Sequence, residues 1–262
     1  MTRTTRTLLA AGTALALSAA AAEAATLVGL TADNQLVRID SGTRRAAAPM
    51  RVTGLEGKLL GIDVRPADMK LYGLTDAGQI VTIDPATGRA TQVSRLSERF
   101  ESGGRATIDF NPVADRLRVM GMNGWSYRVN VETGAVTKDG SLKYQTGTAW
   151  AETTPRVTAG AYTNSMAGAT ATMLFTIDTL SKTLNLQAPP NDGVQQPKGE
   201  IAASLPAGVA FDILSDGAGG NGAWLLAGAS LHKVDLASGK AMPGMPVAGL
   251  PQSEVIDIAA MK

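Results

Sequence analysis

The sequence predicts an all-β chain folded as a five-bladed β-propeller, with the C-terminal strand completing the N-terminal blade. Three observations predict this fold: an Ile-Asp strand motif that recurs at a regular spacing, short strands after each copy, and a last copy with nothing after it. Repeated units of four short strands are typical of propeller blades. One such unit cannot bury both faces of its sheet, so the units pack in a ring.

The repeat is marked by an aspartate in the first strand of each unit. The copies lie at Asp63, Asp109, Asp212 and Asp257, at separations of 46, 103 and 45 residues. The long gap spans two units, and its midpoint falls on RVTAGAYTNS, where Ala161 takes the place of the aspartate. Five residues follow Asp257, and 39 residues run from Ala25 to Asp63, which together give 44 residues. The period therefore closes on itself as five units.

The second strand of each unit is a short apolar run. These runs are TLVGLT, KLYGLT, RLRVMG, ATMLFTID and AWLLAG, beginning at Thr26, Lys70, Arg116, Ala171 and Ala223. The third strands, among them QLVRID and QIVTID, alternate apolar and polar residues with the period of a strand. Turns such as DPATG lead to the fourth strand, because Asp bonds the turn backbone and Gly accepts a positive φ.

The segment SEVIDIAAMK at the end of the chain has the pattern of a first strand. The first unit, TLVGLTADNQLVRID, begins directly with its second and third strands. We therefore expect the C-terminal segment to supply the missing inner strand of the first blade. This closure removes two unpaired sheet edges, which would be an aggregation hazard in an open ring.

Residues 1–24 have the features of a secretory signal peptide. MTRTTR carries two arginines, an uncharged apolar stretch follows, and small residues precede Ala25. Residues 25–262 would then be a single propeller domain, exported to the periplasm or out of the cell. No segment of this domain is long and apolar enough to span a membrane. The chain has no cysteine, so the domain must rely on a hydrophobic core rather than on disulfides.

The formal charges are balanced in the predicted mature domain. The whole chain carries 24 Lys and Arg against 23 Asp and Glu, and residues 1–24 hold two of the basic and one of the acidic residues. A neutral domain has no overall electrostatic attraction to nucleic acid or acidic lipid. The expected partners are therefore an envelope protein or a small-molecule ligand.

The run ATIDFNPVADRLRVMGMNGWSYRVNVETGAVTKDGSLKY, residues 106–144, resembles the central signature of a bacterial exported family known only as a domain of unknown function. The segments KLYGLTDAGQIVTID and GVAFDI are similar to the same family. The resemblance extends over essentially the whole mature chain. It implies a propeller-like fold and export, and it implies no activity, cofactor or catalytic residue.

The composition excludes several catalytic and metal sites. With one histidine and no cysteine, the chain cannot build a multi-histidine or thiolate zinc site. A Ser-His-Asp triad would depend on His232, which lies in the predicted third strand SLHKVDL and is expected to face solvent. No GxSxG, HExxH or nucleotide-binding glycine motif occurs in its required context. We therefore expect a binding module with no required cofactor rather than an enzyme.

The recurring aspartates are the candidate ligand-binding residues. First strands surround a propeller channel, so Asp63, Asp109, Asp212 and Asp257 would form a ring interrupted at Ala161. Carboxylates held close together raise each other's pKa or hold a cation such as Ca²⁺ or Mg²⁺. The alternative function is therefore a metal-assisted hydrolase or lyase. Each aspartate can equally accept a backbone N–H from a neighbouring blade, and strand alternation leaves open which way it faces.

Loop tryptophans are further candidate contacts, because exposed aromatic rings can bind sugars. Trp125, with Tyr127, lies near a predicted turn of the third unit, and Trp150 lies in GTAWAETTP. Trp150 can equally anchor its own loop. Trp224, inside AWLLAG, is expected to pack between blades. The Pro-, Asn- and Gly-containing segment 188–200 is predicted to be a surface excursion.

Overall fold

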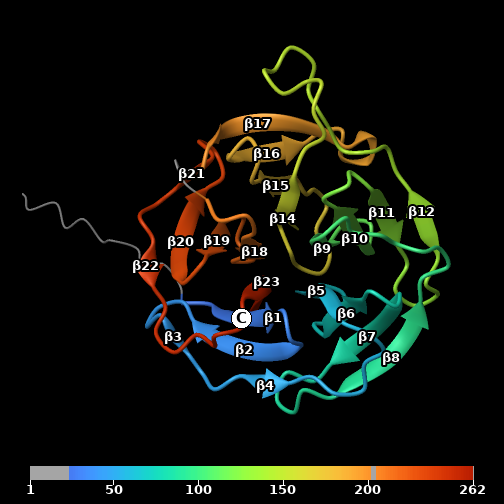
Figure 1. Ribbon diagram of the computed structural model, residues 1–262, viewed down its shortest axis with the longest axis vertical. Coiled ribbons are helices and arrows are strands. Elements are labelled where there is room, and N and C mark those ends of the chain that lie inside the picture. The colour runs from blue at the N-terminus through green and yellow to red at the C-terminus, as the bar shows by residue number, and fades with distance from the viewer. Residues whose placement is uncertain (1–23, 202–204, 262) are drawn as a thin grey trace, which may run out of the picture.

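The computed structural model describes residues 24–201 and 205–261, which form five sheets arranged in a ring (Figure 1). The chain is thus a five-bladed β-propeller, as the repeat predicted. Figure 1 shows one strand of each sheet at the centre of the ring. These inner strands are β5 (Leu59–Val64), β9 (Ala106–Asn111), β14 (Val157–Tyr162), β18 (Ala210–Ser215) and β23 (Val255–Met261). Residues 1–23 of the predicted signal peptide lie outside the described residues.

Blades 2, 3 and 5 are antiparallel meanders that run from the channel to the rim. Blade 2 consists of β5, β6 (Leu71–Thr75), β7 (Gln79–Ile83) and β8 (Ala90–Arg95). Blade 3 consists of β9, β10 (Arg116–Gly121), β11 (Ser126–Val129) and β12 (Val136–Lys138). Blade 5 consists of β18, β19 (Asn221–Ala227), β20 (Ser230–Asp235), β21 (Lys240–Ala241) and β22 (Met245–Pro246).

Blade 1 is completed by the C-terminal strand, as predicted. β23 pairs antiparallel with β1 (Thr26–Thr31), with Thr26 opposite Met261 and Leu30 opposite Asp257. The blade continues through β2 (Gln35–Asp40), β3 (Arg45–Ala46) and β4 (Met50–Arg51). Backbone hydrogen bonds between distant parts of the chain therefore close the ring.

Blade 4 differs from the prediction at its rim. Its strands are β14, β15 (Leu174–Asp178), β16 (Thr183–Gln187) and β17 (Val194–Glu200), and β13 (Lys143–Tyr144) adds parallel to β17. The segment predicted as a surface excursion is instead the short 3-10 helix η1 (Pro190–Asp192) followed by β17. Gln195 of β17 is buried and bonds Thr176 and Gln187 through its side-chain amide. The amino-acid composition of the segment could not show that its polar side chains form hydrogen bonds inside the blade.

The hydrophobic core lies between adjacent blades. At the junction of blades 1 and 2, Val28 and Leu30 pack in one buried cluster with Ile62, Leu71 and Ile83. Similar clusters occupy the junctions of blades 2 and 3, 4 and 5, and 5 and 1. No helix among the described residues is long and apolar enough to cross a membrane.

A buried arginine strengthens the junction of blades 3 and 4. Arg118 donates to the Tyr162 hydroxyl at 3.1 Å, to Asp139 Oδ2 at 2.5 Å and to Asn191 Oδ1 at 2.8 Å. Asp139 also accepts two hydrogen bonds from the Nε and Nη2 atoms of Arg128. Because Asn191 lies in η1, the network fixes the edge of blade 4 to blade 3. A buried charge is tolerated here because its hydrogen-bonding groups have partners.

Candidate functional site

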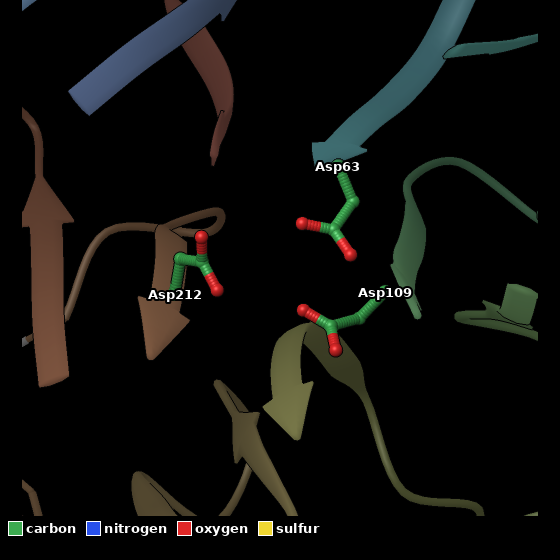
Figure 2. Close-up of side chains that lie close together, drawn as sticks. All are labelled: Asp63, Asp109 and Asp212. Atoms are coloured by element: carbon green, nitrogen blue, oxygen red, sulfur yellow. The ribbon is translucent and has the colours of Figure 1, made fainter. Parts of the chain in front are cut away.

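The four recurring aspartates lie together at the channel. Asp63 is on β5, Asp109 on β9, Asp212 on β18 and Asp257 on β23, and all four are buried. Figure 2 shows the carboxylates of Asp63, Asp109 and Asp212 directed toward one another. One oxygen from each of these three lies within 4.8 Å of the others. The sequence repeat thus brings carboxylates together at the centre of the molecule.

Each of these carboxylates also joins its blade to the next one. Asp257 accepts from the Ile62 N–H at 2.9 Å, Asp63 from Phe110 at 2.6 Å, Asp109 from Tyr162 at 2.9 Å and Asp212 from Ala260 at 2.5 Å. Four of the five junctions between blades carry such a hydrogen bond. The side chains therefore lie where the channel meets the contacts between blades.

Three aspartates use their second oxygen as well. Asp63 accepts from the Val64 N–H at 2.6 Å, Asp212 from Ile213 at 2.6 Å and Asp257 from Ile258 at 3.0 Å. Asp109 differs, because among the described residues its carboxylate accepts one hydrogen bond, from the Tyr162 N–H to Oδ1. Asp109 is therefore the ring member whose free oxygen is best placed to meet a proton or a cation.

Burial is the largest cause that raises the pKa of each ring aspartate. The charge of Asp212 raises the pKa of Asp63 further, and the charges of Asp63 and Asp212 raise that of Asp109. Burial raises the pKa of Asp257 well above its usual range, and it raises the pKa of Asp212 to about 7. The backbone N–H bonds oppose these shifts only in part. The ring therefore retains protons in mildly acidic solution.

Blade 4 lacks the aspartate and is joined to blade 5 in another way. Ala161 is fully buried in the same apolar cluster as Phe211. Beyond it, the Asn164 N–H donates to Asn221 Oδ1 at 2.7 Å, and the Ser165 hydroxyl donates to the Ile213 carbonyl at 2.9 Å. The sequence repeat did not identify these contacts, because it marks only the position of the recurring aspartate.

Arg105 crosses the channel at the end where the inner strands begin. Its guanidinium pairs with Glu254, and Nη1 donates to the Ile256 carbonyl at 3.3 Å. It also lies against Gly208, where an added Cβ would come within 2.1 Å of Arg105 Nε. Arg105 therefore links blades 3, 5 and 1 across this opening, and its charge contributes a small lowering to the pKa of Asp257, which burial raises.

The opposite end of the channel holds a small cavity. The cavity has a volume of about 20 Å³ and is lined by Asp63, Asp212 and Ser165, among others. A volume of roughly 10–15 Å³ suffices for one water molecule. This end of the ring is therefore large enough for a single water or ion and too small for an organic substrate.

Exposed apolar side chains gather around that end of the channel. The loops between first and second strands all lie on this side, because the inner strands run in the same direction along the channel. These loops carry Met69, Val113, Met166 and Met173, which are 36–56% exposed. We call this side the loop face. A cleft of about 450 Å³ opens there between blades 1 and 2, and one of about 410 Å³ opens between blades 3 and 4.

The tryptophans predicted as loop contacts pack against tyrosines. Trp125 stacks on Tyr127 at a centroid distance of 5.9 Å, and Trp150 is tilted against Tyr144 at 6.4 Å. Both indoles remain about one-third exposed, at 37% and 36%. Trp224 is buried in the cluster between blades 5 and 1. Neither Trp125 nor Trp150 lines the channel cavity or the two clefts of the loop face.

His232 lies apart from the aspartate ring. It is on β20, and β19 separates that strand from the inner strand β18. Its Nδ1 atom is 2.9 Å from the Met242 carbonyl oxygen. The imidazole is half-buried, whereas the sequence predicted a side chain facing solvent. The backbone at Gly244 lies against the imidazole, since a Cβ added at Gly244 would lie 2.3 Å from the ring.

Comparison with solved structures finds similar proteins of low sequence identity. A protein of unknown function from Bacteroides thetaiotaomicron VPI-5482 has a TM-score of 0.55 and 16% identity, over 89% of this chain and 61% of its own. A protein of unknown function from Bacteroides caccae gives 0.46 and 11%, over 86% and 73%. The β-propeller domain of Cps50 (Swd1) from Myceliophteria thermophila gives 0.47 and 14%, over 88% and 66%. At such identities, the similarity concerns the fold alone.

Sequence comparison identifies a family. No curated protein matches this chain. The family model described as a domain of unknown function, DUF4394, matches residues 20–259, which include all five inner strands except the last two residues of β23. The chain therefore belongs to the DUF4394 family.

Proposed function

We propose that this chain is an exported, non-enzymatic binding module whose binding surface is the loop face. The observation that carries the proposal is that exposed apolar side chains line two clefts on this face: Met69 lines the one of about 450 Å³, and Val113 and Met173 line the one of about 410 Å³. Exposed apolar patches on soluble proteins commonly mark interaction sites. Methionine suits such a surface, because its flexible thioether adapts to different ligand shapes.

The hydrogen bonds of the aspartate ring favour binding over catalysis. Asp63, Asp212 and Asp257 use both carboxylate oxygens on backbone N–H groups. A substrate could engage these oxygens only by competing with contacts that join the blades. The adjoining cavity of about 20 Å³ would also exclude an organic substrate. A catalytic acid or base must come within hydrogen-bonding distance of the proton that it transfers.

A thermal-shift screen of small molecules tests the binding proposal. The double variant Met69→Gln, Met173→Gln removes apolar surface from the loop face, and Met242→Gln is a matched control on the rim at 60% exposure. We expect ligands that stabilise the wild type and the control but not the double variant. A ligand at about 100 times its Kd adds roughly 2.7 kcal/mol of stability. Ligands that are chemically converted, or that stabilise the double variant equally, would contradict the proposal.

A metal-assisted hydrolase or lyase is the second candidate function. It is favoured by the three carboxylate oxygens of Asp63, Asp109 and Asp212 within 4.8 Å of one another, beside a cavity of ion size. Carboxylates are suitable ligands for Ca²⁺ and Mg²⁺. The test is turnover of chromogenic ester, phosphate and glycoside substrates with Ca²⁺, Mg²⁺ or Mn²⁺ and after EDTA. Turnover that requires both the ion and Asp109 would establish this candidate instead of the binding module.

A further inference from the structure

The cleft between blades 1 and 2 combines an apolar floor with basic side chains. Met69 and Met261 contribute apolar surface to its lining above the buried Leu71 and Ile83, and Lys70 and Arg89 contribute positive charge. Both cations are exposed. Neither side chain forms a hydrogen bond or an ion pair with a residue in the described part of the chain. Their charges are therefore available to a ligand in this cleft.

The acidic residue of the same cleft is engaged by its own turn. Asp84 accepts the Ala86 N–H at 2.8 Å and the Thr87 hydroxyl at 2.8 Å. These two bonds are the largest causes that lower its pKa, and the charge of Arg38 on β2 is the smallest. Of the charged residues that line the cleft, two are basic, Lys70 and Arg89, and the acidic one, Asp84, already has hydrogen-bond partners, so the lining carries a net positive charge.

The cleft between blades 3 and 4 provides an internal comparison. It has a similar volume, about 410 Å³, and a similar apolar character, with Val113, Met173 and Leu186 in its lining. None of its lining residues is charged. The positive charge is thus specific to the blade 1–2 cleft and is not a general property of the loop face.

We infer that the blade 1–2 cleft binds a small amphipathic anion, namely a carboxylate with an acyl or aryl body. This inference rests on the proposed function and names the ligand class of one cleft on the loop face. The carboxylate would lie between Lys70 and Arg89, since charge-assisted hydrogen bonds to Arg and Lys are the strong ones. The apolar body would cover Met69 and Met261. A volume of about 450 Å³ lies within the usual range of small-molecule sites, roughly 300–1,000 Å³.

The test is calorimetric titration of the full chain with decanoate, decanamide and decylamine, which share one apolar body and differ in head-group charge. We expect decanoate to bind at least ~10-fold more tightly than decanamide, and decylamine to bind weakest. The double variant Lys70→Gln, Arg89→Gln should lose about tenfold in affinity for decanoate and keep its affinity for decanamide. Lys143→Gln, a change at an exposed lysine on β13 of blade 4, is the matched control.

Methyl NMR of the methionines locates the ligand independently of affinity. Decanoate should shift the methyl signals of Met69 and Met261, which line the charged cleft, and leave Met173 of the uncharged cleft unchanged. Three results would each overturn the inference: no binding of decanoate, equal affinity for decanoate and decanamide, or an unchanged affinity for decanoate in the Lys70→Gln, Arg89→Gln variant. If the thermal-shift screen still yields loop-face ligands, only the ligand class is wrong. If the screen also fails, the proposed function is wrong as well.

Discussion

At the residue scale, the aspartate ring is governed by a balance between burial and hydrogen bonding. Each carboxylate loses water on folding, and this loss raises its pKa. In return, each accepts a backbone N–H of the following blade, a group that would otherwise be left unpaired near the channel. The protonated side chain can keep this acceptor role, so the blade contact does not require the charge.

Two substitutions at Asp109 separate the contribution of its hydrogen bond to stability from the contribution of its charge. Asp109→Ala leaves the Tyr162 N–H without its partner and should lower the free energy of unfolding by ~1–3 kcal/mol. Asp109→Asn keeps an acceptor for Tyr162 and removes the buried charge, so it should equal or exceed the wild type in stability at pH 8. Urea denaturation of the three proteins measures both effects. Equal losses in the two variants would show that the charge itself is needed.

The raised pKa values predict that stability depends on pH. The folded-state pKa of Asp212 is about 7, against an ordinary value of 3.8. Between these values the folded protein binds more protons than the unfolded chain, so the ring's contribution to stability falls as pH rises from about 4 to 7. The loss from Asp212 is on the order of a few kcal/mol.

Urea titrations at a series of pH values, in wild type and in Asp109→Asn, measure the ring's part of this dependence. Subtracting the two curves cancels titrations elsewhere in the chain. The wild type should lose stability more steeply than the variant as pH rises, because the variant has one fewer coupled carboxylate. A steeper loss in the variant would contradict the assignment.

At the element scale, closure by β23 is the feature that the sequence predicted most directly. Deleting residues 253–262 should remove the inner strand of blade 1, expose the edge of β1 and abolish cooperative thermal unfolding. Because Met261 pairs with Thr26, the same ten residues fused by a short linker ahead of Ala25 should restore the blade. Circular dichroism melts compare the deleted, rearranged and native chains. A deletion variant that melts as cooperatively as the native chain would disprove closure by this strand.

The sequence predicted the structure correctly where the repeat determines it. The prediction was wrong or incomplete where the structure depends on contacts between particular side chains. The spacing of the Ile-Asp motif placed the inner strands, because every blade repeats the same packing. The rim of blade 4 was predicted wrongly, since the fit of Gln195 against Thr176 and Gln187 depends on side-chain geometry. The link between blades 4 and 5 through Ser165 was missed for a related reason: it depends on a loop side chain that contacts the next blade, at a position the repeat does not mark.

At the scale of the whole molecule, the two faces of the propeller differ in what they offer a ligand. One end of the channel is crossed by Arg105, and the other opens beside exposed methionines and two clefts. The aspartate ring was predictable from the sequence because its members recur at one strand position. The loop face was not, because Met69 and Met173 become neighbours of clefts only when the blades pack.

The most direct test of the central claim is thermal melting in EDTA and then with Ca²⁺, Mg²⁺ or Mn²⁺, for wild type and Asp109→Asn. The claim is that the buried aspartates join the blades and that ligands bind on the loop face. It predicts the same melting temperature in EDTA and with each ion. An ion bound at about 100 times its Kd would instead add roughly 2.7 kcal/mol of stability, a rise of a few degrees. Such a rise in the wild type, absent from Asp109→Asn, would contradict the claim and make the ring a metal site.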